Sequence, residues 1–223
     1  MADVLGLPEA TVVVHDRNLV VAGLRTKSGR GWSAAKVTPR DAAQLVTAIL
    51  GSSQVKDSID TVRRYGETRP CDPTLAHENF AQIGIAELAH LPCGHSFIDA
   101  LEALIAAAAS GSLVEVVIDK PDQHKARDVN SGPIIEVAAT SPGTVGDIRV
   151  AGTASKKTAS VTYDLPSPWD GAELPPADQL DAWEKRVKAE RTDADLEELR
   201  RISGKTIMRL GKLLTPLRET SHA

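Results

Sequence analysis

The residues best suited to chemistry form a short basic segment that is rich in glycine. Residues 16–40 contain six Lys or Arg residues and one acid, Asp16. Gly29 and Gly31 flank Arg30, and glycine lets a loop approach a ligand closely. The planar guanidinium group of Arg matches the geometry of a phosphate group. This combination predicts a surface that binds phosphates.

Charge is distributed unevenly along the chain. The whole sequence of 223 residues has a formal net charge of -4, whereas residues 1–70 carry ten Lys or Arg residues against seven Asp or Glu residues. That segment is therefore +3 and the remainder is -7. A basic patch on an acidic protein indicates a localised phosphate-binding surface and excludes a protein coated in positive charge.

The residues before the basic segment follow the order of two helices joined by a tight turn. A short apolar segment, residues 1–5, meets Gly6-Leu7-Pro8, and a longer segment ends at Ala22-Gly23. Gly6 tolerates a positive φ, and Pro8 suits the first turn of a helix because its missing N–H needs no partner there. This order, followed by a basic, glycine-rich strip, resembles the helix-turn-helix of winged-helix transcription regulators, with its wing.

The resemblance covers about residues 1–65 and implies which side chains face DNA. Ala2 and Leu5 match the inward positions of the first helix of the motif. In the second helix, Val12, Leu19 and Val20 recur at helical spacing and are expected to pack inward. By elimination, the residues expected to face a groove of DNA are Thr11, His15, Arg17 and Asn18. The basic residues expected to contact DNA beside them are Arg25, Lys27, Arg30, Lys36 and Arg40.

The chain departs from the family in one respect. A three-helix unit has a further helix before this pair, whereas Met1 already lies within the motif. Thr38-Pro39-Arg40-Asp41 predicts a helix start with Thr as its cap, and this helix is expected to end at Gly51. Another helix is expected from about Ser53 to Tyr65. Either these two helices supply the third member of the unit, or the native start lies upstream of Met1, or the N-terminal segment is an ordinary amphipathic core helix and not this motif.

The rest of the chain predicts a mixed organisation. Helices are expected over residues 75–91 and 96–109, and β-branched runs predict strands over residues 113–118, 133–139, 147–150 and 159–165. A proline-rich connector over residues 166–176 precedes a charged helical tail. We therefore expect an α+β fold in three parts. These are a helical domain like a helix-turn-helix or winged helix (residues 1–66), a middle helix with a small antiparallel sheet (75–165) and a helical tail (176–218).

The predicted tail carries an apolar stripe and a basic end. The stripe consists of Leu196, Leu199, Ile202, Ile207, Leu210 and Leu213. A stripe of this kind is typical of a packing seam. It is expected to bury either against the middle region or against a second copy, and we favour the second copy, which would make a homodimer. The basic end contains Arg200, Arg201, Lys205, Arg209, Lys212 and Arg218, with no acid between them. It is either a second contact with nucleic acid or a solvated helix face.

Signals for catalysis and for metal binding are weak. Cys71, His77, His90, Cys93 and His95 share one stretch, but they lack the Cys-x-x-Cys pair of many zinc sites. Ser203-Gly204-Lys205-Thr206 ends like a phosphate-binding loop, but the earlier glycine of that motif is absent. We therefore expect no enzymatic activity, no cofactor and no metal. No apolar stretch is long enough to span a membrane and no signal peptide is evident, which predicts a cytoplasmic protein.

These observations predict a sequence-specific DNA-binding regulator of transcription, bacterial or phage, that binds double-stranded DNA as a homodimer. Two-fold symmetry is expected because one module reads only a few bases. One alternative is a DNA-packaging or partition adaptor that uses the same module in a larger assembly. Another alternative, from a different class, is a protein-interaction module without DNA binding, in which the N-terminal helices only pack.

Overall fold

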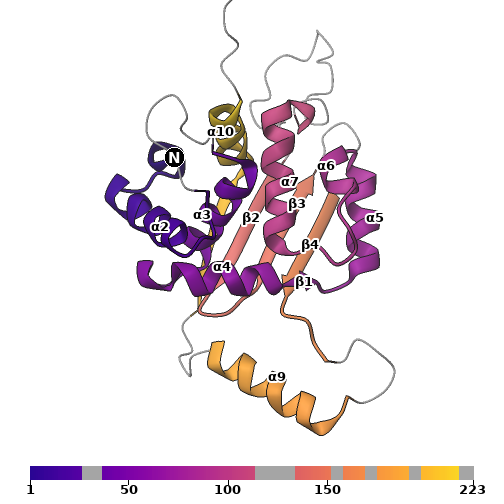
Figure 1. Ribbon diagram of the computed structural model, residues 1–223. Coiled ribbons are helices and arrows are strands. Elements are labelled where there is room, and N and C mark those ends of the chain that lie inside the picture. The colour runs from indigo at the N-terminus through magenta and orange to yellow at the C-terminus, as the bar shows by residue number, and fades with distance from the viewer. Residues whose placement is uncertain (27–36, 114–133, 152–157, 169–174, 191–196, 216–223) are drawn as a thin grey trace, which may run out of the picture.

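The computed structural model describes residues 1–26, 37–113, 134–151, 158–168, 175–190 and 197–215 (Figure 1). Its helices are α1 (Ala2–Leu5), α2 (Glu9–Val21), α3 (Pro39–Gly51), the short 3-10 helix η2 (Val55–Asp57), α4 (Ser58–Glu67), α5 (Pro73–Ile83), α6 (Ala86–Ala89), α7 (Phe97–Ser110), α9 (Ala177–Glu190) and α10 (Gly204–Leu214). Its strands are β1 (Arg69–Pro70), β2 (Ile134–Ser141), β3 (Gly146–Ala151), β4 (Thr158–Asp164) and β5 (Glu198–Ser203). The fold class is α+β, as predicted.

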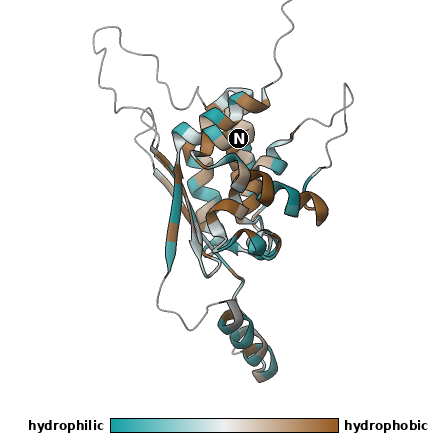
Figure 2. Ribbon diagram, turned by 90° about the vertical axis from the view of Figure 1, so that its left-hand side faces the viewer, coloured by the Kyte–Doolittle hydropathy of each residue, from teal (hydrophilic) through white to brown (hydrophobic). Residues whose placement is uncertain are grey.

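The five strands form one antiparallel sheet in the order β1-β4-β3-β2-β5, and helices cover one of its faces (Figures 1 and 2). Side chains alternate between the two faces along each strand, and in β4 every second residue is buried. Ala159, Val161 and Tyr163 face the helices, whereas Ser160 and Thr162 are exposed. This alternation is typical of an antiparallel sheet with one solvated face.

The two longer α-helices of the core, α3 and α7, begin at capping boxes in which side chains satisfy the free amides of the first turn. In α3 the Thr38 hydroxyl accepts from the Asp41 amide at 3.0 Å, and the Asp41 carboxylate accepts from the Thr38 amide at 2.9 Å. Ser96 and Asp99 make the same pair of bonds at the start of α7. These bonds supply partners for amides that no helical carbonyl can reach, which defines where each helix starts.

The core lies between α3, α4, α7 and the sheet, and three aromatic rings mark its centre. The ring centroids of Tyr65 and Phe97 are 5.2 Å apart, and those of Phe97 and Tyr163 are 5.7 Å apart. The Tyr65 hydroxyl donates to the carbonyls of Thr140 and Val145, at 2.9 and 3.0 Å. These two bonds attach α4 to the end of β2 and to the turn that follows it, so they join the helical layer to the sheet.

The predicted helical tail is wrong over residues 198–203, which form β5 and pair with β2. The physical reason is the free edge of β2, whose N–H and C=O groups need partners and receive them from this segment. The apolar stripe of the tail is therefore divided between two elements. Ile207 and Leu210 of α10 are fully buried in the chain's own core, whereas Leu199 and Leu213 are more than half exposed.

Other expectations differ from the structure in detail. The predicted helix over residues 75–91 is two helices, α5 and α6, because Gly84 interrupts it with a φ of 82°. The predicted helix from about Ser53 begins at Ser58, after η2. The predicted strand over residues 113–118 falls almost wholly outside the described residues. Buried residues from Val12 to Leu210 form a single hydrophobic cluster, so the three predicted parts share one core.

Within the described residues, no helix combines the length and the apolar character that crossing a membrane requires.

Candidate nucleic-acid interface

The helix-turn-helix resemblance places α2 at the DNA, but two of its four candidate residues face the protein interior. His15 is only 5% exposed, and its Nδ1 lies 2.7 Å from the Ser58 Oγ. The Ser58 hydroxyl donates to the Val55 carbonyl, so it accepts from His15, which assigns the proton to Nδ1. Burial lowers the pKa of His15, and the nearby charge of Arg200 lowers it further. The expectation that this side chain faces a groove is therefore wrong.

Asn18 is also committed to a contact within the chain. Its side-chain amide donates to the Val55 carbonyl at 3.0 Å. Thr11 is half-buried, and Arg17 is the exposed member of the predicted set. The other exposed residues of α2 are Glu9, Ala10 and three valines, Val13, Val14 and Val21, which are exposed by 53%, 45% and 77%. The exposed side of α2 therefore offers few of the hydrogen-bonding groups that read base edges.

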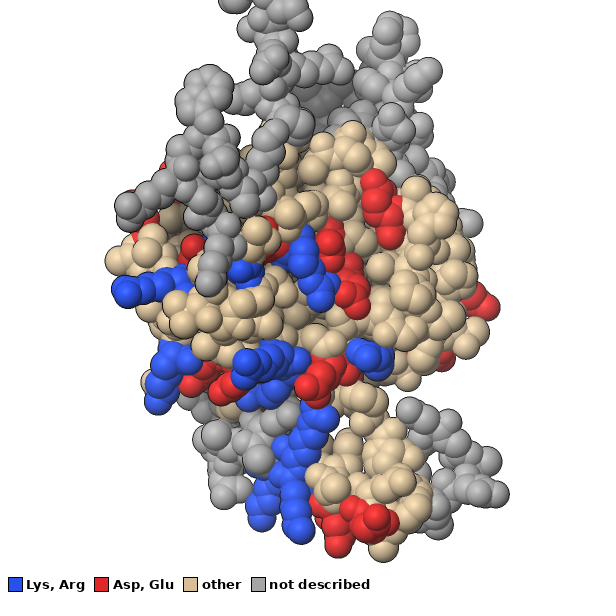
Figure 3. Space-filling model, viewed as in Figure 1, with Lys and Arg blue, Asp and Glu red and all other residues tan. Residues whose placement is uncertain are grey.

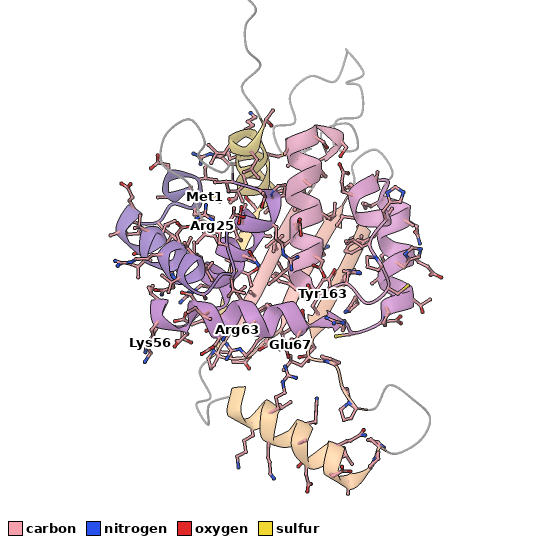
Figure 4. All side chains as sticks on the ribbon, in the orientation of Figure 1. Met1, Arg25, Lys56, Arg63, Glu67 and Tyr163 are labelled. Carbon is pink, nitrogen blue, oxygen red and sulfur yellow. The ribbon has the colours of Figure 1, made fainter. Side chains whose placement is uncertain are left out.

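Arg25 is held by an ion pair at the start of the predicted wing. It binds Asp16 of α2, and its side chain is only 14% exposed. Burial lowers the pKa of Arg25, against the opposing effect of Asp41. In Figure 4 it lies beside Met1, and both residues line a cavity of about 380 Å³ next to α1. Arg25 therefore stabilises the entry to the basic segment and is poorly placed to contact phosphates itself.

Arg40, the last residue of the predicted set, bridges two helices. Its guanidinium group donates to Asp99 at 2.5 Å and to Glu102 at 3.0 Å, both on α7. Burial opposes the charged form of Arg40, but the bonds to these two carboxylates outweigh it and raise its pKa. The remaining predicted residues, Lys27, Arg30 and Lys36, lie outside the described residues.

The two ends of the basic segment are tied together at the start of α3. The Asp41 carboxylate accepts hydrogen bonds from the amide of Thr26, at 2.8 Å, and from the amide of Thr38, at 2.9 Å. The carboxylate is buried, which alone would raise its pKa, but these bonds outweigh burial and lower it. Thr26 and Thr38 bound the segment that contains Lys27, Arg30 and Lys36, so Asp41 anchors the base of that segment.

The clearest basic surface of the described residues lies on α10. Lys205, Arg209 and Lys212 are exposed and recur every third or fourth residue, and no acid occurs between Gly204 and Leu214. The opposite side of the helix is buried against α7, where Gly211 lets the two helices approach closely. The sequence predicts these basic residues but assigns them to a helical tail. In the structure, packing of α10 against α7 places them on one face of the folded protein.

α10 also contacts α1 and α3. The basic end of the chain therefore lies next to the helix that anchors the basic N-terminal segment. By contrast, the face shown in Figure 3 mixes the two signs of charge along α4 and α9. In Figure 4, Lys56, Arg63 and Glu67 lie along the lower edge of this face. Glu67 forms an ion pair with Arg186 of α9.

The cysteine and histidine residues do not assemble a metal site. Cys71 and Cys93 line a cavity of about 490 Å³ beside α9. His95 is buried instead, bonded to the Pro92 carbonyl at 2.7 Å and to the Tyr163 hydroxyl at 2.9 Å. Across the described part of the chain, no three His, Cys, Asp or Glu side chains are grouped so that they could hold a metal ion. Burial, followed by the charges of Asp164 and Asp147, raises the pKa of Cys71, which disfavours the reactive thiolate.

Comparison with known proteins found no matching family model, no matching curated protein and no matching solved structure.

Proposed function

We propose that this protein binds double-stranded DNA through the basic face of α10 and the basic segment between Thr26 and Thr38, and that it acts as a regulator of transcription. The observation that carries the proposal is the exposed row of Lys205, Arg209 and Lys212 on a helix without acids. A localised row of cations on an acidic chain attracts the phosphate backbone without making the whole surface adhesive.

The geometry of α10 suits a phosphate contact. Lys205 and Lys212 are seven residues apart, which is about 10 Å along a helix axis. The apolar side of α10 is packed against α7, so the backbone positions that carry the three cations are fixed before any ligand binds. A row of this length can contact several phosphates without any ordering of the helix backbone, so the entropic cost is limited to the three side chains.

The basic segment after α2 supplies the second half of the proposed interface. Its glycines allow close approach to a backbone, and Asp41 holds its two ends at α3. Because α3 contacts α10, the two basic regions can engage one duplex. His15 and Asn18 take no part in this proposal, since both are bonded to residues 55–58. The regulatory role rests on the resemblance of the N-terminal segment.

The test is a salt titration of DNA binding by fluorescence anisotropy. The variant Lys205→Gln/Arg209→Gln/Lys212→Gln is compared with wild type on labelled duplexes of unrelated sequence. Each phosphate contact contributes about 0.9 to the slope of log affinity against log salt, so losing three contacts should reduce the slope by about 3. Affinity should fall on every duplex alike.

The matched control is Lys56→Gln/Arg63→Gln/Lys185→Gln, which removes three exposed cations from the surface of mixed charge on η2, α4 and α9. This variant should bind DNA with the wild-type slope. Equal losses in both variants would show only a general effect of net charge. Wild-type protein that does not bind duplex DNA at low salt would overturn the proposal.

A second candidate is a protein-interaction module, and the exposed valines of α2 favour it. Three large apolar side chains on one helix side are uncommon on a surface that contacts only water or DNA. The variant Val14→Lys/Val21→Lys distinguishes the two functions. It should leave DNA affinity unchanged or slightly increased, whereas an interaction module that uses this face would lose its partner.

A further inference from the structure

Strand β5 lies at the edge of the sheet. It pairs with β2 on one side, and among the described residues no strand pairs with its other side. In Figure 2, which views the molecule from this side, the sheet is seen along its edge at the left and the helices lie to its right. An open edge of this kind presents a row of backbone N–H and C=O groups that can pair with another strand.

The register of the sheet shows which residues of β5 present those groups. The Thr140 amide donates to the Val145 carbonyl, so even-numbered residues of β2 are bonded toward β3 and odd-numbered residues toward β5. Residues 198, 200 and 202 are opposite Ser141, Ala139 and Val137, and they direct their backbone toward β2. Leu199 and Arg201 therefore direct their N–H and C=O groups toward the open edge.

The side chains along this edge form a self-complementary pattern. The sequence Glu197-Glu198-Leu199-Arg200-Arg201 has two acids, one apolar residue and two bases. Leu199 is 59% exposed, so a second copy could cover its apolar side chain. Charged side chains normally protect an edge strand from pairing. Here an antiparallel copy of the same strand would place acids opposite bases.

We propose that β5 pairs with β5 of a second copy of this chain, antiparallel and with the two-fold axis at Leu199. In this register Leu199 lies opposite its own copy, Glu198 lies opposite Arg200 of the second copy, and Glu197 lies opposite Arg201 of the second copy. The two sheets then form one continuous sheet of ten strands.

Both the charge pattern and the backbone select this register. Moving the axis to Arg200 or Arg201 would place two guanidinium groups opposite each other, which is destabilising. At Leu199 the edge-facing N–H and C=O groups of the two copies exchange hydrogen bonds directly, as a hydrogen-bonded antiparallel pair requires. The Glu197–Arg201 pairs between the copies and the apolar pair at the centre stabilise the pairing. Arg200 contributes less, because it already binds Glu198 of its own chain and the carbonyls of Ile49 and Ser52.

This proposal goes beyond DNA binding and does not depend on it. It also replaces the tail seam that the sequence predicts, because Ile207 and Leu210 of that seam are buried within the chain. The second copy is thus expected at the sheet edge, and the basic face of α10 remains free.

Charge reversal tests the register. We expect the variants Glu197→Lys and Arg201→Glu each to raise the dissociation constant of the dimer by about tenfold, measured by sedimentation equilibrium. Arg200 is left unchanged because it donates to the Ile49 and Ser52 carbonyls at 3.0 and 2.7 Å and so supports the fold. An equimolar mixture of the two variants should dimerise like wild type, since each reversed residue then meets its opposite charge. The double variant should also recover.

A cysteine at the axis gives a second measurement. In a background with Cys71→Ser and Cys93→Ser, the variant Leu199→Cys should form a disulfide-linked dimer when treated with oxidised glutathione. The Cα atoms of such a pair lie about 5.5 Å apart, within the range of a disulfide. The matched variant Arg201→Cys should crosslink poorly with itself, because its counterpart is Glu197.

Three outcomes would overturn the proposal. These are a wild-type chain that remains monomeric at high concentration, a dimer that neither charge reversal weakens, and a failure of Leu199→Cys to crosslink above the level of Arg201→Cys. Circular dichroism of each variant verifies that the altered, exposed side chains leave the fold intact. DNA binding is measured separately, so its failure would not affect these results.

Discussion

The Asp41 carboxylate accepts a hydrogen bond from the backbone amide of Thr26, fifteen residues earlier in the chain, at 2.8 Å. The same carboxylate caps α3 by accepting from the Thr38 amide. One side chain therefore takes part in the capping box of a core helix and binds the backbone amides at both ends of the basic segment. This link connects the stability of the core with the placement of residues proposed to bind DNA.

Replacing Asp41 should affect stability and DNA binding together. Asp41→Ala removes the carboxylate that completes the capping box of α3, and it should lower the free energy of unfolding by about 1–2 kcal/mol. It also releases the base of the basic segment, so affinity for duplex DNA should fall even at temperatures where the variant is fully folded. Urea unfolding and anisotropy measure the two effects. Asp72→Ala is the control, because it removes the cap of α5 that accepts from the Leu75 amide and touches no proposed DNA contact. Equal affinity of the two variants would contradict the anchoring role.

Two buried histidines should make the fold sensitive to mild acid. Burial is the main cause that lowers the pKa of both His15 and His95 below the ordinary value of 6.5. Below pH 6.5 the unfolded chain binds more protons than the folded chain. The stability contributed by the neutral histidines is therefore fully present above this pH and is lost as the pH falls toward the pKa values of the folded state. Urea midpoints measured from neutral pH to about pH 5 should therefore decrease. In His15→Gln this decrease should be smaller, and a slope equal to that of wild type would contradict the assignment of His15 as buried and neutral.

Close packing of α10 against α7 should make Gly211 intolerant of a side chain. A Cβ atom at this position would lie 2.5 Å from the backbone carbonyl carbon of Ala108. Gly211→Ala should therefore destabilise the protein by about 1–3 kcal/mol through overpacking. Thermal unfolding measures this, with Gly66→Ala of α4 as the control. A Cβ atom at Gly66 would meet only Ile98 Cδ1, at 3.9 Å, so that change should be neutral or stabilise by up to about 1 kcal/mol. Similar melting temperatures for the two variants would show that α10 can move away from α7.

Deleting the chain from residue 193 onward should not leave a folded monomer. The deletion removes β5, which pairs with β2 over six residues, and removes Ile207 and Leu210, which are fully buried. The burial of these two side chains alone contributes about 3–6 kcal/mol, a large part of the stability of a typical domain. We expect the truncated protein to aggregate or to lose cooperative unfolding in calorimetry. A cooperative transition near that of the full chain would show that the remaining elements fold without β5 and α10.

Local signals in the sequence were sufficient where a residue and its partner are neighbours. Thr38 and Asp41 predicted the start of α3, and both bonds of the capping box are present. Gly6 was expected to adopt a positive φ and has a φ of 67°. The β-branched run over residues 159–165 predicted β4, because the preference of these side chains for extended backbone is local. The exposed cations of α10 were also evident from composition, since charge needs no partner to remain in water.

Tertiary structure decided the features that depend on distant partners. His15 and Asn18 are polar and stand on a helix, so the sequence placed them in solvent, but Ser58 and Val55 satisfy their hydrogen bonds inside the protein. Arg40 was assigned to phosphates and binds Asp99 instead, 59 residues later in the chain. Residues 198–203 have apolar spacing and charges that suit a helix, yet the unpaired edge of β2 makes a strand more stable. Intrinsic helix propensity differs by less than about 1 kcal/mol per residue among most side chains. The row of backbone hydrogen bonds to β2 therefore outweighs the helix propensity of this segment.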